Sequence, residues 1–518
     1  MHDPQIPKDT SADMAQDALQ LAARIARGEL SAREALAQTL ARVEQLNPRL
    51  NAIASLAAEL GYERAEQLDA ERSACKNDSE LARLHARYPF FGVPLLLKDV
   101  GPATAHTRLP SRMGSRAFGP TGVVWPSDGT LTRRYLAAGF VPFGRSTSPE
   151  MGMSASTEAV VYGGPTRNPH DITRSAGGSS GGAASALASG MVAIAHANDG
   201  AGSIRIPAAA SGLIGLKPSR GLVPTGPLVG EAWGGLAIDH MLTRSVRDCA
   251  VALDVSAGGD AGAPYASPAW DGRAGVLAIE VPPPRLRIGL CNHFFEGDAV
   301  DAEVASAVDD FARWLEGQGH WVTPVRLPFS TRDVVQPVMQ VVATGSAMIL
   351  EAHARSRGRP LGGDELEPVT ASACRTARSL GAVDYLQAVS SFHTLGRRMG
   401  EFHEQYDLLL TPTLAEPAAV LGRFAMDKPD FIDYRLGPQG LWRYTPFTPL
   451  ANATGAPSIS LPVGKSRSGL PIGAMLGAAL GQDLLLLRVA RQWELSGQLA
   501  PAMALSSAAQ ALLQAGRS

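Results

Sequence analysis

Two clusters of glycine and serine carry the residues of this sequence that are best suited to chemistry. They are residues 177–182 (GGSSGG) and residues 200–203 (GAGS). Glycine permits positive φ angles and close approach of other groups, and backbone N–H groups in such turns can converge on an anion. A serine among them could act as a nucleophile, with those N–H groups stabilising the oxyanion that forms on its substrate.

Each cluster also has a plainer interpretation, because most glycine-rich turns are only turns and most serines are surface or capping residues. The first cluster is not a phosphate-binding P-loop, since Ala183 rather than lysine follows Gly182, and G-x-G-x-x-G is also absent. The G-x-S-x-G spacing of a nucleophile elbow is absent around Ser203 and is met only inside the run GGSSGG, which we interpret as a glycine-serine turn rather than an elbow. A hydrolase of the Ser-His-Asp plan is therefore not indicated.

Lys98 is a third candidate. It ends an apolar run over residues 90–97 that is typical of a buried strand. Burial disfavours the ammonium and lowers a lysine pKa from about 10.4, and a neutral lysine can act as a base, which arginine cannot. Only six of the 47 lysine and arginine residues are lysine, so a lysine at the end of an apolar run raises the question of whether it has a specific role. The alternative is an ion pair with Asp99 at the strand end, which this run alone favours.

The elements around these stretches would hold them in turns between strands and helices. A capping box at Ser31 and Glu34 indicates a helix that stops near Pro48, and a second helix is expected over residues 53–74. The other elements expected before residue 200 are helices at 15–27, 130–138 and 183–188 and strands at 90–100, 140–144 and 191–197.

The second half of the chain contains a predicted strand-helix-strand unit over residues 286–323, which indicates an α/β arrangement. Residues 256–286 are rich in glycine, proline and alanine, so an irregular segment is expected there. The remaining expectations are mainly helix over 330–445, strands at 407–412, 457–463 and 470–476, and a closing helix at 483–495.

Composition excludes several classes of protein. The chain has 518 residues, 45% of them hydrophobic and 19% charged, which is typical of an ordinary globular protein. The net charge is −2, so no nucleic-acid partner is indicated. The polar N-terminus does not resemble a signal peptide, and the small-residue run at 183–197 is too short to span a membrane. We expect a cytoplasmic protein without a membrane partner.

The four cysteines give no sign of a disulfide framework or a metal site. They are widely scattered, with no C-x-x-C pair and no histidine at metal-ligand spacing. We therefore expect reduced thiols, no metal and no cofactor, and activity that is indifferent to chelators. The cysteines are Cys75, Cys249, Cys291 and Cys374.

Taken together and in order, these stretches resemble the amidase signature family over roughly residues 15–497. No single motif is specific, but the combination is. The matching motifs are the strand ending in Lys98-Asp99, GPTRNP at 164–169, GGSSGG at 177–182, DGAGSIRIPA at 199–208, GLKP at 215–218, LLTPT at 409–413, NATGAP at 452–457 and GLPIG at 469–473.

The resemblance implies an α/β fold in which a large mixed β-sheet is covered on both faces by helices. It also implies one amidase domain over residues 1–518. Within it, N-terminal helices over 1–85 would pack on the core, 90–220 would form the signature core, and 221–518 would complete it and contribute substrate-lining insertions. The pocket would be lined by the divergent segments 101–160 and 330–450.

The resemblance further implies a Ser-Ser-Lys triad. Ser203 matches the nucleophile, Ser179 matches the bridging serine that usually follows a cis peptide bond, and Lys98 matches the base. This agrees with the chemistry inferred from the residues, since a neutral lysine could take a proton from Ser179 while Ser179 takes one from Ser203. The expected reaction is amide hydrolysis through an acyl-enzyme.

The same resemblance assigns the oxyanion hole and its supports. The backbone N–H groups of Gly200, Ala201, Gly202 and Ser203 would form the oxyanion hole. The supporting residues would be Ser180, Asp199 and Arg205, although a structural ion pair explains Arg205 equally well. One departure is Ala201, where the family usually has glycine; we expect the backbone there to tolerate alanine.

Residues 154–158 (SASTE) and 195–199 (AHAND) resemble the branch of 6-aminohexanoate-cyclic-dimer hydrolases. The expected substrate is then a small linear or cyclic amide, and a homodimer is compatible with the sequence. His196 within that run is interpreted as a packed strand residue. Two alternatives stay open: the glutaminase subunit of a tRNA-dependent amidotransferase, and an inactive amidase-like binding protein.

Overall fold

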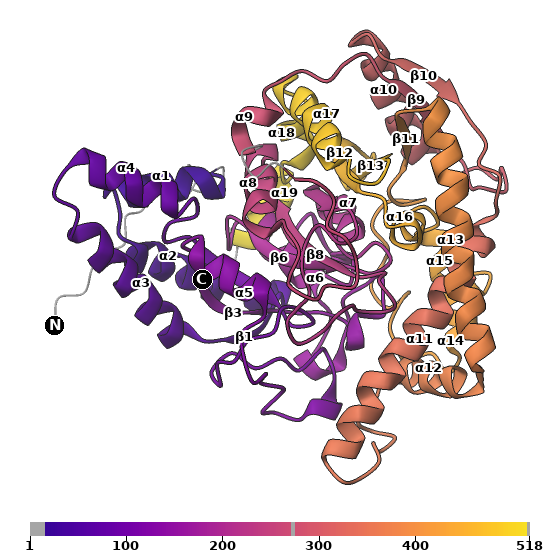
Figure 1. Cartoon of the computed structure of the whole chain (residues 1–518), viewed down its shortest axis with the longest axis horizontal. Helices are drawn as coiled ribbons and strands as arrows, with labels where there is room; N and C mark the ends of the chain where they lie inside the picture. Colours follow the sequence, from indigo (N-terminus) through magenta and orange to yellow (C-terminus); the bar gives the residue numbers. More distant parts are fainter. Residues whose placement is uncertain (1–15, 271–274, 515–518) are drawn as a thin grey trace.

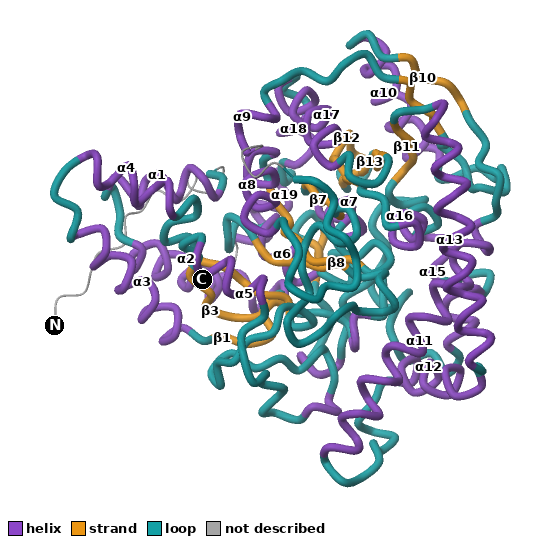
Figure 2. The backbone as a smooth tube through the Cα atoms, in the orientation of Figure 1, coloured by secondary structure: helices purple, strands orange, loops and turns teal. Residues whose placement is uncertain are grey.

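A long mixed β-sheet carries Lys98 and leads directly into the second serine cluster in the computed structural model, which describes residues 16–270 and 275–514. Within those residues the sheet has eleven strands in the order β1-β3-β2-β6-β8-β7-β12-β13-β11-β9-β10 (Figures 1 and 2). Along the chain the strands are β1 (Ile53–Leu56), β2 (Pro94–Lys98), β3 (Val141–Ser146), β6 (Ala195–Asp199), β7 (Ile214–Lys217), β8 (Ile238–Thr243), β9 (Arg287–Leu290), β10 (Trp321–Pro324), β11 (Leu408–Pro412), β12 (Ser458–Lys465) and β13 (Pro471–Ala478), beside a separate hairpin of β4 (Arg167–Asn168) and β5 (Asp171–Ser175).

The pairing of β2 and β6 places the candidate residues at one edge of the sheet. β2 runs parallel to both β3 and β6, with Leu96 opposite Ala195. Since parallel strands end at the same edge, Lys98 at the end of β2 and Asp199 at the end of β6 lie at that edge. β8 runs antiparallel to β6, and β7 runs antiparallel to β8.

Alternate side chains of β2 enter two different hydrophobic cores, as expected for a strand buried on both faces. Leu95 and Leu97 pack in a cluster with α5, α8, α10 and α17, whereas Leu96 packs in a cluster with α2, α3, α6 and α7. The predicted fold of a mixed sheet covered on both faces is therefore confirmed. The helices named are α2 (Ala32–Leu50), α3 (Ala58–Ser73), α5 (Thr130–Ala137), α6 (Gly181–Ala188), α7 (Arg205–Ser211), α8 (Val246–Ser256), α10 (Ala302–Gly317) and α17 (Asp483–Leu495).

A third core joins the helices between residues 331 and 454, drawn in orange at the right of Figure 1. They are α11 (Thr331–Ser356), α12 (Pro368–Ser379), α13 (Ala382–Gln405), α14 (Phe431–Leu436), α15 (Leu441–Tyr444) and α16 (Thr448–Thr454). The remaining helices are α1 (Ala18–Arg27), α4 (Asp78–Arg87), α9 (Gly275–Ile279), α18 (Leu499–Met503) and α19 (Ser507–Gln514). The mainly helical region expected over 330–445 is thus confirmed.

In the described part of the chain, α11 is the one helix long and apolar enough to cross a membrane. Of its most apolar window, 56% is buried inside the protein, and it packs against α12 and α13. A mostly buried core helix of this length passes the same test, so α11 is weak evidence for a membrane span.

Several predicted boundaries shift: the strand expected to reach residue 100 is Pro94–Lys98, and the strand expected over 191–197 is Ala195–Asp199. Two further boundaries are wrong. Residues 53–74 do not form one helix, because Ile53–Leu56 pairs antiparallel with β3, and α3 starts only at Ala58. Residues 53–56 are too few for their own pattern to indicate a strand, and they form one because β3 offers a free edge for pairing. The helix expected to stop near Pro48 runs to Leu50, since a proline in the last turn removes a single backbone donor. The capping box at its start is confirmed.

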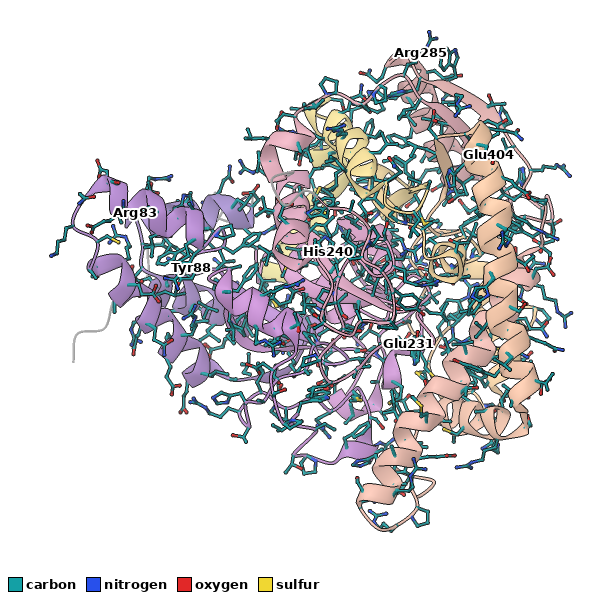
Figure 3. The ribbon with its side chains drawn as sticks, in the orientation of Figure 1. Arg83, Tyr88, Glu231, His240, Arg285 and Glu404 are labelled. Carbon is teal, nitrogen blue, oxygen red and sulfur yellow. The ribbon has the colours of Figure 1, made fainter. Side chains whose placement is uncertain are left out.

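The strand-helix-strand unit is confirmed, with β9 and β10 parallel and α10 between them in the chain. Charged side chains such as Arg83, Arg285 and Glu404 lie at the margin of the molecule, whereas His240 lies inside it and is fully buried (Figure 3). Buried charged groups are therefore the exception here, and several of them gather where β2 and β6 end.

Candidate active site

Lys98 ends β2 with its side chain fully buried. Its Nζ lies 2.6 Å from Oγ of Ser179 and 2.5 Å from Oδ1 of Asn198. Burial lowers the pKa of Lys98 from 10.5 to about 7, against the opposing charges of Asp239 and Asp199. Near neutral pH a large share of the molecules therefore carries an uncharged amine that can accept a proton.

Residues of β6 hold Lys98 in place. Asn198 donates from Nδ2 to the carbonyl of Val100 at 2.7 Å, which directs its Oδ1 toward Nζ. His196 accepts the backbone N–H of Lys98 at Nδ1 over 3.3 Å, so Nε2 carries the ring proton and donates to Asp239 at 3.0 Å. Burial lowers the pKa of His196, which favours the neutral ring. His196 is thus a packed strand residue, as interpreted from the sequence.

Asp99 does not pair with Lys98, so the ion-pair alternative is wrong. Its carboxylate accepts hydrogen bonds from the backbone N–H groups of Arg112 at 2.9 Å and Gly114 at 3.0 Å, and from the hydroxyl of Tyr162. Successive side chains at a strand end point in opposite directions. Asp99 consequently fastens a neighbouring loop and leaves the amine of Lys98 without a carboxylate partner.

The first serine cluster forms the turn before α6. The peptide bond between Gly178 and Ser179 is cis, as the family resemblance implied. A Cβ at Gly178 would lie 2.6 Å from the carbonyl oxygen of Ser154, so this position requires glycine. Ser180 donates from its hydroxyl to the carbonyl of Asn198 at 3.3 Å. The turn is therefore tied to the same strand that holds Lys98.

Ser203 lies between β6 and α7 and is 8% exposed. Within the described residues its hydroxyl makes no hydrogen bond to Ser179, so the link from Lys98 to Ser179 is formed and the next link is open. Catalytic hydrogen bonds often tighten only when substrate is bound. Gly152 lies beside this gap: it lines one cavity with Ser203, and a Cβ there would lie 3.4 Å from Oγ of Ser179.

A buried ion pair anchors the second cluster. The carboxylate of Asp199 accepts from Nε and Nη2 of Arg205, each at 2.9 Å, and both side chains are fully buried. Asn452 donates to Asp199 at 2.9 Å and accepts from Arg205 at 2.6 Å. Burial alone would raise the pKa of Asp199, but Arg205 and Asn452 hold it below its ordinary value. Removing one partner of such a pair typically costs about 3–5 kcal/mol.

Asp199 also fixes the backbone that was expected to form the oxyanion hole. Its carboxylate accepts from the N–H groups of Gly202 at 2.6 Å and Ile204 at 3.1 Å. The N–H of Gly202 is therefore already engaged. The N–H groups of Ala201 and Ser203 have no hydrogen-bond partner in the described part of the chain, so they can receive a substrate oxygen.

Alanine fits at position 201, as expected. The left-handed φ of this turn falls on Gly202, at +129°, and Ala201 is not among the described residues with positive φ. A Cβ on Gly202 would lie 2.3 Å from Oγ1 of Thr448 and 2.6 Å from Cδ1 of Ile206. The position that requires glycine is therefore 202.

The cavity in front of Ser203 has mostly apolar walls. Residues of the loop around Gly152 form one side, and side chains of α11, α14 and α15 form the other. Both lie within the segments 101–160 and 330–450 that were expected to line the pocket. Trp442 of α15 and Met339 of α11 are typical of this lining.

Trp233 is a part of the site that sequence reasoning missed. It lines the cavity with φ of +50°, and its ring occupies the space in which a Cβ on Gly200 or Gly345 would lie, at 2.6 Å in each case. The Trp233 ring therefore packs between the end of β6, which leads to Ser203, and helix α11. A lone tryptophan before two glycines gave no signal. Asn198 and Asn452 stood inside matched motifs, but nothing local revealed their partners.

No group of three or more histidine, cysteine, aspartate or glutamate side chains is arranged to hold a metal ion within residues 16–270 and 275–514. Of the four cysteines, Cys249, Cys291 and Cys374 are buried, Cys75 is partly exposed, and all are free thiols.

Known proteins resemble this chain over almost its whole length. A family model described as Amidase matches residues 34–487. The chain is 34% identical over 491 residues to a 6-aminohexanoate-cyclic-dimer hydrolase from Pseudomonas sp. (strain NK87), covering 93% of this chain and 95% of that one.

Solved structures agree. A 6-aminohexanoate cyclic dimer hydrolase complexed with substrate superposes with a TM-score of 0.84 and 31% identity, covering 95% of this chain and 98% of that one. A bacterial aryl acylamidase of the amidase signature family gives a TM-score of 0.83 and 25% identity, covering 94% and 97%.

The turn geometry yields a paired prediction. Gly202→Ala is expected to lower kcat/KM about 100-fold or more, because the clash with Thr448 would displace the neighbouring N–H groups that are open to a substrate oxygen. Ala201→Gly is expected to change kcat/KM by no more than about threefold, since its φ needs no glycine. Steady-state kinetics on one amide would measure both. Equal losses in the two variants would contradict this assignment of the strained position.

Proposed function

Since the chain belongs to the amidase family and is a hydrolase of carbon–nitrogen bonds, we propose that it cleaves a carboxamide through an acyl-enzyme formed on Ser203. The observation that carries the proposal is the 2.6 Å contact between Nζ of Lys98 and Oγ of Ser179, at a lysine whose burial lowers its pKa to about 7. This contact supplies a base at neutral pH without a histidine.

The proposed first step moves one proton along the two serines. In the uncharged lysine, the Ser179 hydroxyl donates to the lone pair of Nζ, while Asn198 Oδ1 accepts one of the amine hydrogens. Ser179 passes its proton to Lys98 and takes the proton of Ser203 as that hydroxyl turns toward it. The Ser203 oxygen then attacks the amide carbon and forms a tetrahedral intermediate.

The oxyanion that develops would be bound by the open N–H groups of Ala201 and Ser203, with Gly200 as a further candidate. The N–H of Gly202 acts indirectly, since its bond to Asp199 sets the shape of the turn. Collapse of the intermediate breaks the carbon–nitrogen bond, and the proton held by Lys98 returns through Ser179 to the departing amine. A water molecule then attacks the acyl-enzyme while the same relay of Ser179 and Lys98 takes its proton, and the acid leaves Ser203.

The substrate class follows from the cavity and the relatives. Apolar side chains of α11 and α15 suit an aliphatic chain, and two relatives bear the name of 6-aminohexanoate-cyclic-dimer hydrolase. We therefore propose a small aliphatic amide, linear or cyclic, of the 6-aminohexanoate type. An inactive binding protein is the competing interpretation, and the compatible geometry at Ala201 weakens it.

A fluorophosphonate probe tests the nucleophile. Intact-protein mass spectrometry should show one covalent adduct on the wild type and none on Ser203→Ala, because only an activated serine reacts. Ser180→Ala is the matched control: among the described residues its hydroxyl makes one hydrogen bond, to the carbonyl of Asn198, and none to Lys98, Ser179 or Ser203, so this variant should keep the adduct. An unlabelled wild type, or a labelled Ser203→Ala, would count against the proposed nucleophile.

The pKa of Lys98 predicts the pH profile. The active form is the neutral amine, so kcat/KM should rise with pH, reach half its plateau near pH 7 and stay high above it. Lys98→Arg should lose activity about 100-fold or more, because arginine cannot give up its proton.

The second buried lysine provides the control for that profile. Burial also lowers the pKa of Lys217 to about 7, but its Nζ donates to the carbonyl of Pro218. Lys217→Met should therefore keep the acidic limb in its remaining activity. If kcat/KM of the wild type does not change between about pH 5 and pH 9, no base with a pKa of about 7 takes part in the reaction.

A further inference from the structure

Arg435 is a charged side chain in the cavity that the proposed mechanism does not use. It belongs to α14, and among the described residues that line this cavity it is the only one with a formal charge. Apolar side chains such as Val338, Met339 and Trp442 form much of the rest of the wall. A cation thus lines a mostly apolar cavity whose wall offers no anion.

The guanidinium of Arg435 is incompletely satisfied. One nitrogen, Nη2, donates to the backbone carbonyl of Met153, and the guanidinium carbon lies 5.3 Å from the ring centre of Phe431. Its Nε is buried without a hydrogen-bond partner, and Nη1 makes no hydrogen bond within residues 16–270 and 275–514. Burial lowers the pKa of Arg435.

Arg435 is partly buried, and the two fully buried arginines among the described residues, Arg205 and Arg145, are compensated. Arg205 forms the two-bond pair with Asp199. Arg145 donates to the carbonyls of Lys98 and Leu109. Arg435 has neither a carboxylate within salt-bridge distance among the described residues nor such a set of carbonyls. A partly desolvated cation without a counter-charge is costly, and a ligand carboxylate would offset that cost.

We propose that Arg435 binds a carboxylate carried by the substrate, which makes the preferred substrate a linear amide with a distal carboxylate. This deepens the proposed function and rests on it. A carboxylate presents two oxygens in the plane that a guanidinium fork matches. The apolar walls between Arg435 and Ser203 would enclose a methylene spacer. A cyclic amide has no free carboxylate and would leave Arg435 unpaired.

The test compares matched amides with and without the carboxylate. One series carries it on the acyl fragment, from succinamate to suberamate, each against the unsubstituted amide of equal chain length. The other carries it on the amine fragment, as N-acetyl-ω-amino acids against the N-acetyl alkylamines. The two series reveal which side of the scissile bond faces Arg435. The variants are Arg435→Gln, Arg435→Lys and, as control, the exposed Arg375→Gln.

In the wild type, the best carboxylate of one series should exceed its neutral counterpart in kcat/KM by about tenfold to 100-fold, the range of a charge-assisted hydrogen bond. Arg435→Gln should remove that preference, so that its kcat/KM values for the carboxylate and for the neutral counterpart agree within about threefold, and measurable hydrolysis of the neutral amides would show that its site is folded. Arg435→Lys should keep part of the preference, and Arg375→Gln all of it.

A binding measurement separates this inference from the proposed function. Alkanoates from butanoate to octanoate should raise the melting temperature of the wild type and not of Arg435→Gln, while the corresponding alcohols raise neither. If neutral amides are hydrolysed and carboxylates are not preferred in either series, the inference is overturned and the proposed function stands. If nothing is hydrolysed but alkanoates still bind through Arg435, the proposed function fails and the carboxylate site stands. Alkanoate binding that survives in Arg435→Gln would overturn the site itself.

Discussion

An ammonium group that loses its water must find a counter-charge or lose its proton, and the site depends on how Lys98 meets that constraint. β2 carries Lys98 into an interior where its amine contacts a serine hydroxyl and an amide oxygen and no carboxylate. The nearest acidic neighbour in sequence, Asp99, is turned away and engaged by a loop. Neutral amine is therefore accessible near pH 7, and a base results from burial alone.

A second buried charge is treated in the opposite way. Asp199 keeps its charge because Arg205 and Asn452 saturate it, and the saturated carboxylate then orders the turn that carries Ser203. β2 thus ends in Lys98, which can lose its proton, whereas the neighbouring β6 ends in Asp199, whose negative charge is fully paired. The serines lie between them, which gives the relay a base at one end and a rigid anion-binding turn at the other.

Much of this arrangement could be predicted from the sequence, because strong local patterns specify it. The apolar run before Lys98, the capping box at Ser31 and the unit from β9 to β10 all formed as predicted. The predictions that failed concern residues whose partners are distant in the chain. The strand Ile53–Leu56 exists because β3 offers an edge, and the partners of Asp99, Trp233 and Asn452 lie where no local pattern points. The role that we propose for Arg435 likewise depends on a cavity that forms only when separate helices pack together.

The central claim, that Lys98 loses its proton near neutral pH, can be measured directly. The chain has only six lysines, so a protein labelled with carbon-13 at lysine Cε gives few NMR signals, and the spectrum of Lys98→Met identifies the one that matters. The account predicts that this signal titrates with a midpoint near pH 7, well below the ordinary lysine value. A signal that stays in the ammonium position up to about pH 10, as for an exposed lysine, would contradict it.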